Sequence, residues 1–417
     1  MREAYRRHSD ALGRHIGLSG EGIRTAATHG LQLWFTTASV AVLGFVTPLA
    51  FIKLAEPADY GRFSLIAAIV AISNIVTLPG MNISLKQAAA RGFHGAMAQT
   101  ARIRVRFALL GVLGLLTVGV LMRVAGDSRT GNLIVLLAPL LPLIYGIDVS
   151  QSFLNGIQKF WPLSMWMMLG ALVPSAAVVL LLLLAVGPDI ALLGYYAALA
   201  AVNVAAYVWV SSRYRRNADS DPESIRYGKR LTVVTSLGSL QFYLDRLVVA
   251  SVLSLEALAI YSAGKMFQQG IAITWGALNQ LYTPKHASRS IEDARHLTRT
   301  TLPYVWAFFG VLAVIVIAAA PSVVGIVFGE AYASVVPVAR LLTIAAVVAI
   351  PSAQFELLFT STGDEKRLYA HRITFATTQV ILVGGGAALF GLHGAVAGTT
   401  LTYALNSVTG FLLDRWR

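Results

Sequence analysis

Long apolar runs separated by short polar stretches dominate the chain. Each run holds about 20 residues, the length that an α-helix needs to cross a bilayer. The pattern predicts an all-α, polytopic membrane protein with about twelve transmembrane helices. The runs cover residues 31–52, 63–84, 105–124, 133–154, 163–187, 190–211, 231–253, 258–281, 302–325, 336–360, 370–391 and 393–413.

A hydrophilic break divides the runs into two groups of six. We expect a basic N-terminal segment (1–29), a six-helix bundle (30–211), a cytoplasmic linker (212–230) and a second six-helix bundle (231–417). Two weak internal matches relate helices six apart, as a duplicated bundle requires, which places a cavity between two pseudo-symmetric halves. The matches pair 59–64 with 257–262, and 156–159 with 363–366.

Basic residues are distributed unevenly among the polar stretches. Of 33 Lys and Arg, 26 are counted with the terminal segments and alternate loops, 4 with the opposite loops, and Arg246, Lys265 and Arg340 with helices. Basic residues close to the end of a run, namely Arg106, Arg123 and Arg372, are counted with the adjoining loop. The positive-inside rule therefore predicts that both termini are cytoplasmic. The net charge of +13 is interpreted as a topology signal, so no nucleic-acid partner is expected.

Composition argues against several kinds of chemistry. The chain is 56% hydrophobic and 13% charged, and it has no cysteine, so disulfides, thiolate nucleophiles and cysteine-bound metals are excluded. Its eight histidines show no metal-ligand spacing, and no nucleotide-binding loop occurs. We therefore expect no metal and no cofactor. No nucleophile, base and stabiliser can be assembled, so an enzyme is not expected either.

Three charged residues interrupt the apolar helices 231–253 and 258–281: Asp245, Arg246 and Lys265. A charge at the bilayer centre costs about 3 kcal/mol or more, so such residues usually face a wet cavity. Arg246 and Lys265 are equally far from the turn near Leu255, each roughly 10 Å below the helix ends. Two cations at one depth suit a pyrophosphate, with Asp245 as a partner for Arg246. The alternative is an ion pair that holds the helices together.

Two further acids, Asp148 and Glu356, occupy nearly equivalent positions under the internal repeat. They are candidates for binding a coupling proton or cation, or for a gate that opens as the halves move. They could equally be hydrated residues at a helix mouth. Nearby prolines, Pro139, Pro142 and Pro351, favour kinks. A glycine-rich stretch, 384–398, indicates close helix packing.

Five short motifs occur along the chain: Glu56-Pro57-Ala58-Asp59-Tyr60-Gly61, Gly80-Met81, Leu244-Asp245-Arg246, Ile260-Tyr261-Ser262 and Phe328-Gly329-Glu330-Ala331-Tyr332. In this order and spacing they resemble the polysaccharide-transporter (O-antigen flippase) branch of the multidrug/oligosaccharidyl-lipid/polysaccharide exporter superfamily. The resemblance spans nearly the whole chain. Ala55 and Ala259 stand where the family usually has Gly, and we interpret both as tolerated changes.

The resemblance implies a flippase in the bacterial cytoplasmic (inner) membrane. Its substrate would be an undecaprenyl-pyrophosphate-linked oligosaccharide, a unit of O-antigen, capsule or exopolysaccharide, moved from the cytoplasmic to the outer leaflet by alternating access. Its partners would be that lipid-linked glycan, the bilayer and other membrane proteins of polysaccharide assembly.

Two other functions stay open. An ion-coupled multidrug exporter of the same superfamily would favour acids over cations in its cavity, because its substrates are commonly cationic. A membrane polymerase or ligase would present a sizeable loop with catalytic groups, whereas the external loops here are short.

Overall fold

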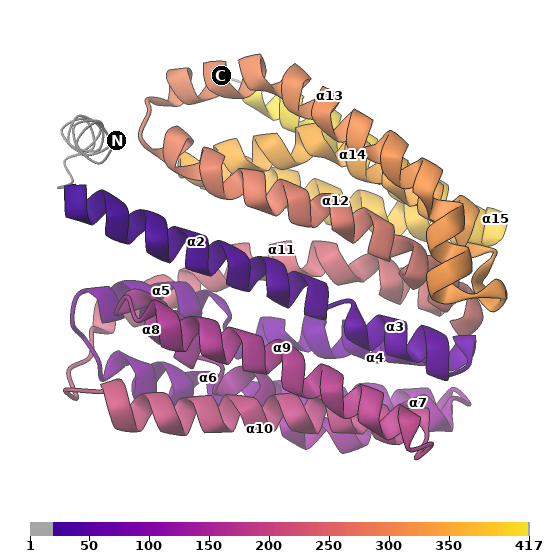
Figure 1. Cartoon of the computed structure of the whole chain (residues 1–417), viewed down its shortest axis with the longest axis horizontal. Helices are drawn as coiled ribbons and strands as arrows, with labels where there is room; N and C mark the ends of the chain where they lie inside the picture. Colours follow the sequence, from indigo (N-terminus) through magenta and orange to yellow (C-terminus); the bar gives the residue numbers. More distant parts are fainter. Residues whose placement is uncertain (1–19, 416–417) are drawn as a thin grey trace, which may run out of the picture.

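The computed structural model describes residues 20–415, and this part of the chain consists of helices joined by short connections, with no strand among these residues (Figure 1). The helices run roughly along the long axis of the molecule. The first helix begins and the last helix ends toward the same end, which we call the terminal end; the opposite end is the distal end. Most of the expected basic N-terminal segment lies outside the described residues.

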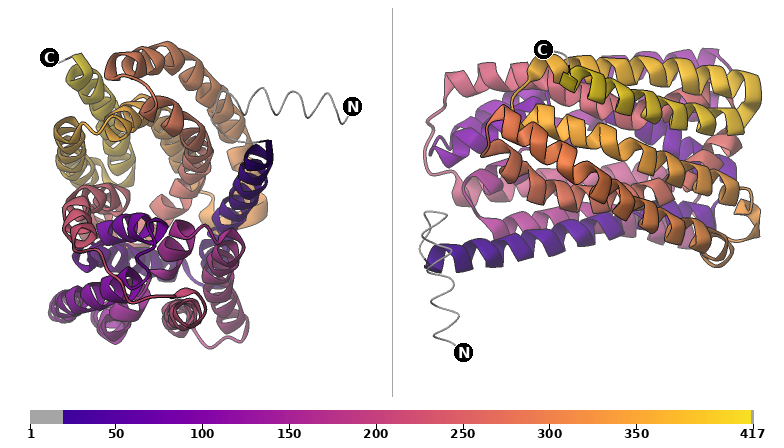
Figure 2. Two further views of the ribbon diagram at one scale, coloured as in Figure 1. Left: turned by 90° about the vertical axis from the view of Figure 1, so that its left-hand side faces the viewer. Right: turned by 90° about the horizontal axis from the view of Figure 1, so that it is seen from above.

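The helices up to residue 214 form a first group and those after residue 254 a second group (Figure 2). The helix between them, α11 (Pro222–Val252), is treated below. The first group contains α2 (Gly20–Leu43), α3 (Val46–Leu54), α4 (Pro57–Ser73), η1 (Asn74–Thr77), α5 (Gly80–Ala90), α6 (Ala96–Val124), α7 (Ser128–Leu137), η2 (Ala138–Leu140), η3 (Pro142–Gly146), α8 (Ser150–Gly156), α9 (Phe160–Leu183) and α10 (Pro188–Tyr214). The second group contains α12 (Leu255–Ala287), α13 (Ile291–Val323), η4 (Val324–Phe328), η5 (Glu330–Tyr332), α14 (Val335–Ser361) and α15 (Glu365–Arg415).

Within the described residues, eight helices are long and apolar enough to cross a membrane, or nine if the bent pair 128–140 and 142–156 is one span. The protein is therefore an all-helical, multi-pass membrane protein. The count is below the expected twelve partly because α11 and α12 carry charged and amide side chains. The other reason is that α15, counted once, contains 51 residues, or about 77 Å of helix.

A sharp reversal at Gly391 divides α15 into two helices. Gly391 has φ +61° and ψ −144°, a conformation that side chains other than glycine rarely adopt. Beyond it the chain returns along the first half so closely that a Cβ on Gly394 would lie 1.9 Å from the carbonyl oxygen of Gly386. The close packing expected for the glycine-rich stretch is thus confirmed at these positions.

The two groups share one hydrophobic core at the distal end but have separate cores nearer the terminal end. The shared core includes Phe51 and Ile66 of the first group and Tyr261 and Tyr332 of the second. Separate clusters form around Phe153 in the first group and around Phe309 and Phe355 in the second. The groups are therefore joined mainly at the distal end.

Close backbone approach joins the groups. At the distal end α4 meets the start of α12, where a Cβ on Gly61 would lie 1.9 Å from the Leu255 carbonyl oxygen. The intervening helix α11 packs against both groups: a Cβ on Gly80 of α5 would lie 2.3 Å from the amide nitrogen of Thr232, and the Arg372 guanidinium of α15 donates to the Val234 carbonyl. Small residues are what permit such contacts between membrane helices.

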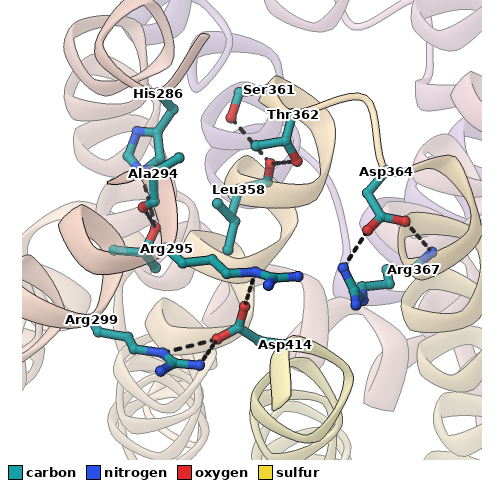
Figure 3. A network of polar contacts seen from close by, with 11 residues as sticks. His286, Ala294, Arg295, Arg299, Leu358, Ser361, Thr362, Asp364, Arg367 and Asp414 are labelled. Carbon is teal, nitrogen blue, oxygen red and sulfur yellow. Dashed lines mark hydrogen bonds and ion pairs between the residues drawn. The ribbon is translucent and has the colours of Figure 1, made fainter. Parts of the chain in front are cut away.

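Ion pairs stabilise the distal end of the first group and the terminal end of the second. At the distal end Asp59 of α4 pairs with Arg62 and Arg129, at 3.0 Å each. At the terminal end the fully buried Asp414 carboxylate pairs with Arg295 at 3.0 Å and Arg299 at 2.6 Å, both from α13 (Figure 3). Asp59–Arg62 lies within α4, and the other pairs join helices of the same group, so they stabilise each group separately.

We expect Gly61→Ala to lower the midpoint of thermal unfolding, because the new methyl group overlaps the Leu255 carbonyl and the helices must move apart. Overpacking of this kind costs about 1–3 kcal/mol. Gly270→Ala is the matched control on α12, since a Cβ there meets nothing within 4 Å and alanine favours a helix by up to about 1 kcal/mol. Equal unfolding midpoints for the two purified variants would contradict the close contact.

Candidate functional site

A cavity of about 520 Å³ lies between the first group and the helices α11 and α12. Its boundary toward the distal end is formed by residues packed on the shared core, such as Tyr60 and Phe63. Among the described residues that line it, Asp148 and Arg246 are the charged ones. The remaining polar groups are amides, hydroxyls and five tyrosines: Gln151, Asn203, Gln269, Thr47, Ser64, Ser175, Ser262, Tyr60, Tyr145, Tyr195, Tyr196 and Tyr243.

Arg246 places a positive charge in this cavity. It lies six residues before the end of α11, about 9 Å from the distal end of that helix. Its Nε is buried and has no hydrogen-bond partner among the described residues. Its Cζ lies 5.8 Å from the centre of the Tyr243 ring, within the range of a cation–π contact. A buried donor without a partner is costly, so this guanidinium is suited to meet an anionic ligand.

The neighbouring residue, Asp245, points away from the Arg246 guanidinium. Its fully buried carboxylate forms an ion pair with the Lys265 ammonium of α12 and accepts a 2.8 Å hydrogen bond from the Tyr261 hydroxyl. That hydroxyl also lies 2.9 Å from Thr399 Oγ1 of α15. The cluster therefore connects α11, α12 and α15.

The expected partnership of Asp245 with Arg246 is wrong, because consecutive residues of a helix do not face each other. Only the backbone amide of Arg246 donates to Asp245 Oδ1, at 2.8 Å. Lys265 is 5% exposed and is not among the residues that line the cavity. The two cations expected to act together are thus separated: Lys265 is neutralised by Asp245, and Arg246 faces the cavity.

Asp148 lines the same cavity nearer the terminal end, at a break in the helix. A few residues earlier, the segments 128–140 and 142–156 meet at 44°, with Pro139 in η2 and Pro142 in η3 on either side of the bend. The kink expected from these prolines is confirmed. Pro351, in contrast, lies inside α14, which continues past it without a break.

The backbone at Asp148 is held by Arg104, which lies one residue outside the expected helix 105–124. Arg104 is 1% exposed, and its guanidinium donates to the Asp148 carbonyl (2.7 Å), Asn82 Oδ1 (2.6 Å) and the Thr77 carbonyl (3.1 Å). These bonds connect α6, the η1–α5 break and the Asp148 turn. The carboxylate of Asp148 remains on the cavity wall.

Glu356 does not lie in this cavity. It lines a second cavity of about 180 Å³ between α11, α12, α14 and α15. Its carboxylate accepts hydrogen bonds from both Nε (2.9 Å) and Nη2 (2.5 Å) of Arg372. Arg372 is another residue that was counted with a loop. The structure therefore separates Asp148 and Glu356: one faces the large cavity, and the other forms an ion pair within the second group.

A family model described as "Polysaccharide biosynthesis protein" matches residues 32–282, more than half of the chain. The chain belongs to this family. The match covers the first group, α11 and most of α12, and so includes the helices that line the large cavity. The polysaccharide family that the motifs predicted is thereby confirmed. No curated protein matches the chain.

Solved transporters that are described as members of the MOP superfamily have the same fold as this chain. An inward-facing multidrug resistance MATE transporter matches with a TM-score of 0.67 at 15% identity, and an outward-facing one with 0.67 at 14%; each covers 92% of this chain and 93% of the other. A Pyrococcus furiosus transporter, described as having a binding pocket of reverse polarity, matches with 0.66 at 14%, covering 92% and 93%. At these identities the likeness shows the fold alone.

Neither family membership nor motif order predicts that Arg104 and Arg372 form these hydrogen bonds, because the contacts depend on how the helices pack. A signal for Arg104 exists in the spacing Arg102-x-Arg104-x-Arg106. Residues four apart share a helix face, whereas the residue between them lies on the opposite face. Arg102 and Arg106 are exposed and Arg104 is buried, as that spacing allows.

We expect Asp245→Asn and Lys265→Met each to lower the stability of the purified protein by about 3–5 kcal/mol, because either change leaves a buried charge unpaired. The double variant should recover most of the loss, since both charges are then gone. Thermal unfolding of the wild type, both single variants and the double variant forms a double-mutant cycle. Additive losses in the double variant would show that the pair is not coupled.

Proposed function

We propose that this protein is a flippase that moves an undecaprenyl-pyrophosphate-linked oligosaccharide from the cytoplasmic to the outer leaflet. The observation that carries the proposal is the Arg246 guanidinium, which lines a cavity of about 520 Å³ and has a buried donor without a partner. A pyrophosphate supplies the acceptor oxygens and negative charge that such a donor needs. Family membership supports a substrate from polysaccharide assembly.

We further infer twelve membrane crossings, in pseudo-symmetric halves of residues 30–211 and 231–417 joined by the segment 212–230. In this topology α11 and α12 each cross once and α15 crosses twice, as its length and its reversal at Gly391 suggest. The basic loops lie at the terminal end, so that end faces the cytoplasm of a bacterial inner membrane.

The packing supports an inward-open state for this topology. The shared core closes the distal end, and Lys53 Nζ of α3 donates to the Ile326 carbonyl of η4 there, at 3.3 Å. Nearer the terminal end the halves have separate apolar cores and meet along α5 and α11, so the cytoplasmic side of the cavity lacks a shared core that closes it. A lipid-linked unit made in the cytoplasmic leaflet would enter from that side. Outward release then requires the distal core to open and the halves to rock.

In this proposal Arg246 contacts the pyrophosphate, while Asp245 and Lys265 hold α11 and α12 in the register that presents it. Transport involves no covalent step, so the protein is not an enzyme. Its partners are the lipid-linked glycan, the bilayer and membrane proteins of polysaccharide assembly.

In a strain that lacks the gene, we expect complete lipid-linked oligosaccharide to accumulate and surface glycan to be lost. Wild type should restore surface glycan. Arg246→Ala should reduce surface glycan at least about tenfold relative to wild type, because a hydrogen bond to a charged group contributes about 1.5–3 kcal/mol to substrate binding. Arg246→Lys should retain part of the activity because it keeps the charge but not the planar fork.

The matched control for this test is Arg340→Ala on α14, an exposed helical arginine outside both cavities, which should complement fully. A multidrug exporter would give a different result. Lipid-linked pools would be unchanged, and the deletion strain would become sensitive to cationic dyes. The similarity in fold to multidrug transporters and the Asp148 carboxylate on the cavity wall are the observations that favour this second candidate.

We also propose that Asp148 binds a coupling proton and that the Glu356–Arg372 pair acts as a gate. In proteoliposomes, Asp148→Asn should abolish the response of outward flipping to an imposed pH gradient. Glu356→Gln should slow flipping with or without the gradient, because Arg372 loses its partner. Asp219→Asn, an exposed acid between α10 and α11, should behave as wild type.

A wild type that ignores the pH gradient would exclude proton coupling. The membrane potential would then be the simpler energy source, since moving one charge through 100 mV contributes about 2.3 kcal/mol.

A further inference from the structure

Four of the tyrosines that line the large cavity gather in one place: Tyr145 of η3, Tyr195 and Tyr196 of α10, and Tyr243 of α11, here called the tyrosine cluster. The phenol groups of Tyr145, Tyr195 and Tyr243 are close enough to interact electrostatically. The rings of Tyr195 and Tyr196 are 5.1 Å apart at 88°, an edge-to-face contact. Three separate elements thus converge on one aromatic surface.

This surface faces the cavity and is not filled by the core. Tyr145, Tyr195 and Tyr243 are partly exposed, whereas Tyr196 is buried behind them. A phenol offers an apolar, electron-rich face and a hydroxyl that donates and accepts hydrogen bonds. The amide residues Gln151 and Asn203 also line the cavity, so apolar faces and hydrogen-bonding groups alternate on the wall.

Two polar groups on the cavity wall have no hydrogen-bond partner among the described residues, and a ligand could provide one. Ser262 is 2% exposed, and its Oγ has no hydrogen-bond partner among the described residues, as is also true of Arg246 Nε. Buried polar groups in folded proteins are nearly always paired. Arg246 and Ser262 come from the adjoining helices α11 and α12, so one bound molecule can meet both.

Sugar rings match this combination of groups. A pyranose presents C–H bonds on its faces, which suit the negative face of an aromatic ring, and hydroxyls around its edge, which suit amides and phenols. The Arg246–Tyr243 contact places the cation beside the tyrosine cluster. When the diphosphate occupies Arg246, the charged group left on the wall is Asp148, three residues after Tyr145, and it would repel an acidic sugar. The ring that fits is uncharged.

The size of the cavity limits how much of a glycan it can enclose. Cavities of roughly 300–1,000 Å³ enclose a ligand of drug size. At about 520 Å³, this cavity suits a diphosphate with one or two sugar rings, and a longer unit must extend out of it.

We propose that the tyrosine cluster binds the uncharged sugar that adjoins the diphosphate, with Arg246 on the diphosphate and the sugar ring stacked on Tyr195 and Tyr243. This inference rests on the proposed function and specifies which part of the substrate is recognised. Distal sugars of the repeat unit do not contribute to affinity in this arrangement.

The test measures binding to the purified full-length protein in nanodiscs. Three probes are compared: bare undecaprenyl diphosphate, the same lipid with one neutral N-acetylhexosamine, and the same lipid with one hexuronic acid. Wild type should bind the neutral sugar lipid about three- to tenfold more tightly than the bare lipid. The uronic acid should give no gain. Tyr195→Leu should remove the gain from the neutral sugar, and Tyr195→Phe should keep most of it.

The controls separate this proposal from the function on which it rests. Tyr304→Leu changes a tyrosine of α13 that is 78% exposed, and it should retain the full gain. Arg246→Ala should weaken binding of all three lipids alike. If wild type binds none of them, the proposed function fails. If it binds all three equally, or if Tyr195→Leu keeps the gain, the proposed function survives and the sugar site is overturned.

Discussion

The structure depends on one constraint: a charge inside an apolar helix must find a partner, because water is not available to solvate it. Asp245 and Lys265 neutralise each other across α11 and α12. Glu356 does the same with Arg372, and Arg104 is satisfied by carbonyl and amide oxygens. Each solution also fixes where helices meet. Against this background Arg246 Nε is a charged donor on a cavity wall that has no partner among the described residues, so a bound ligand can satisfy it.

The position of α11 explains why the Arg246 guanidinium faces the cavity. Its two adjacent charged residues serve different purposes because a helix turns about 100° per residue. Asp245 faces the second group and anchors the helix there, while Arg246 faces the cavity next to the first group. The same helix also approaches α5 through Gly80. A movement between the groups therefore acts directly on the helix that carries the cavity cation.

Much of this was accessible from sequence. Apolar runs located the helices, since a bilayer fixes their length and polarity, and charges within those runs identified α11 and α12. Partner choice was not accessible: nothing in the order of residues shows that Lys265 comes close to Asp245 while Arg246 turns away. Arg104 and Arg372 were assigned to loops because their burial depends on tertiary contacts. The tyrosine cluster was missed for the same reason, since η3, α10 and α11 are distant in sequence.

The reversal at Gly391 has a consequence for how the chain enters the membrane. The two halves of α15 are separated by almost no polar loop and touch backbone to backbone at Gly386 and Gly394. In the twelve-crossing topology, such a pair inserts into the bilayer as a hairpin, and only the residues around the turn cross to the far side. The last helix is thereby returned to the side from which synthesis proceeds. Its orientation is set by the turn itself, without the need for basic residues beyond it.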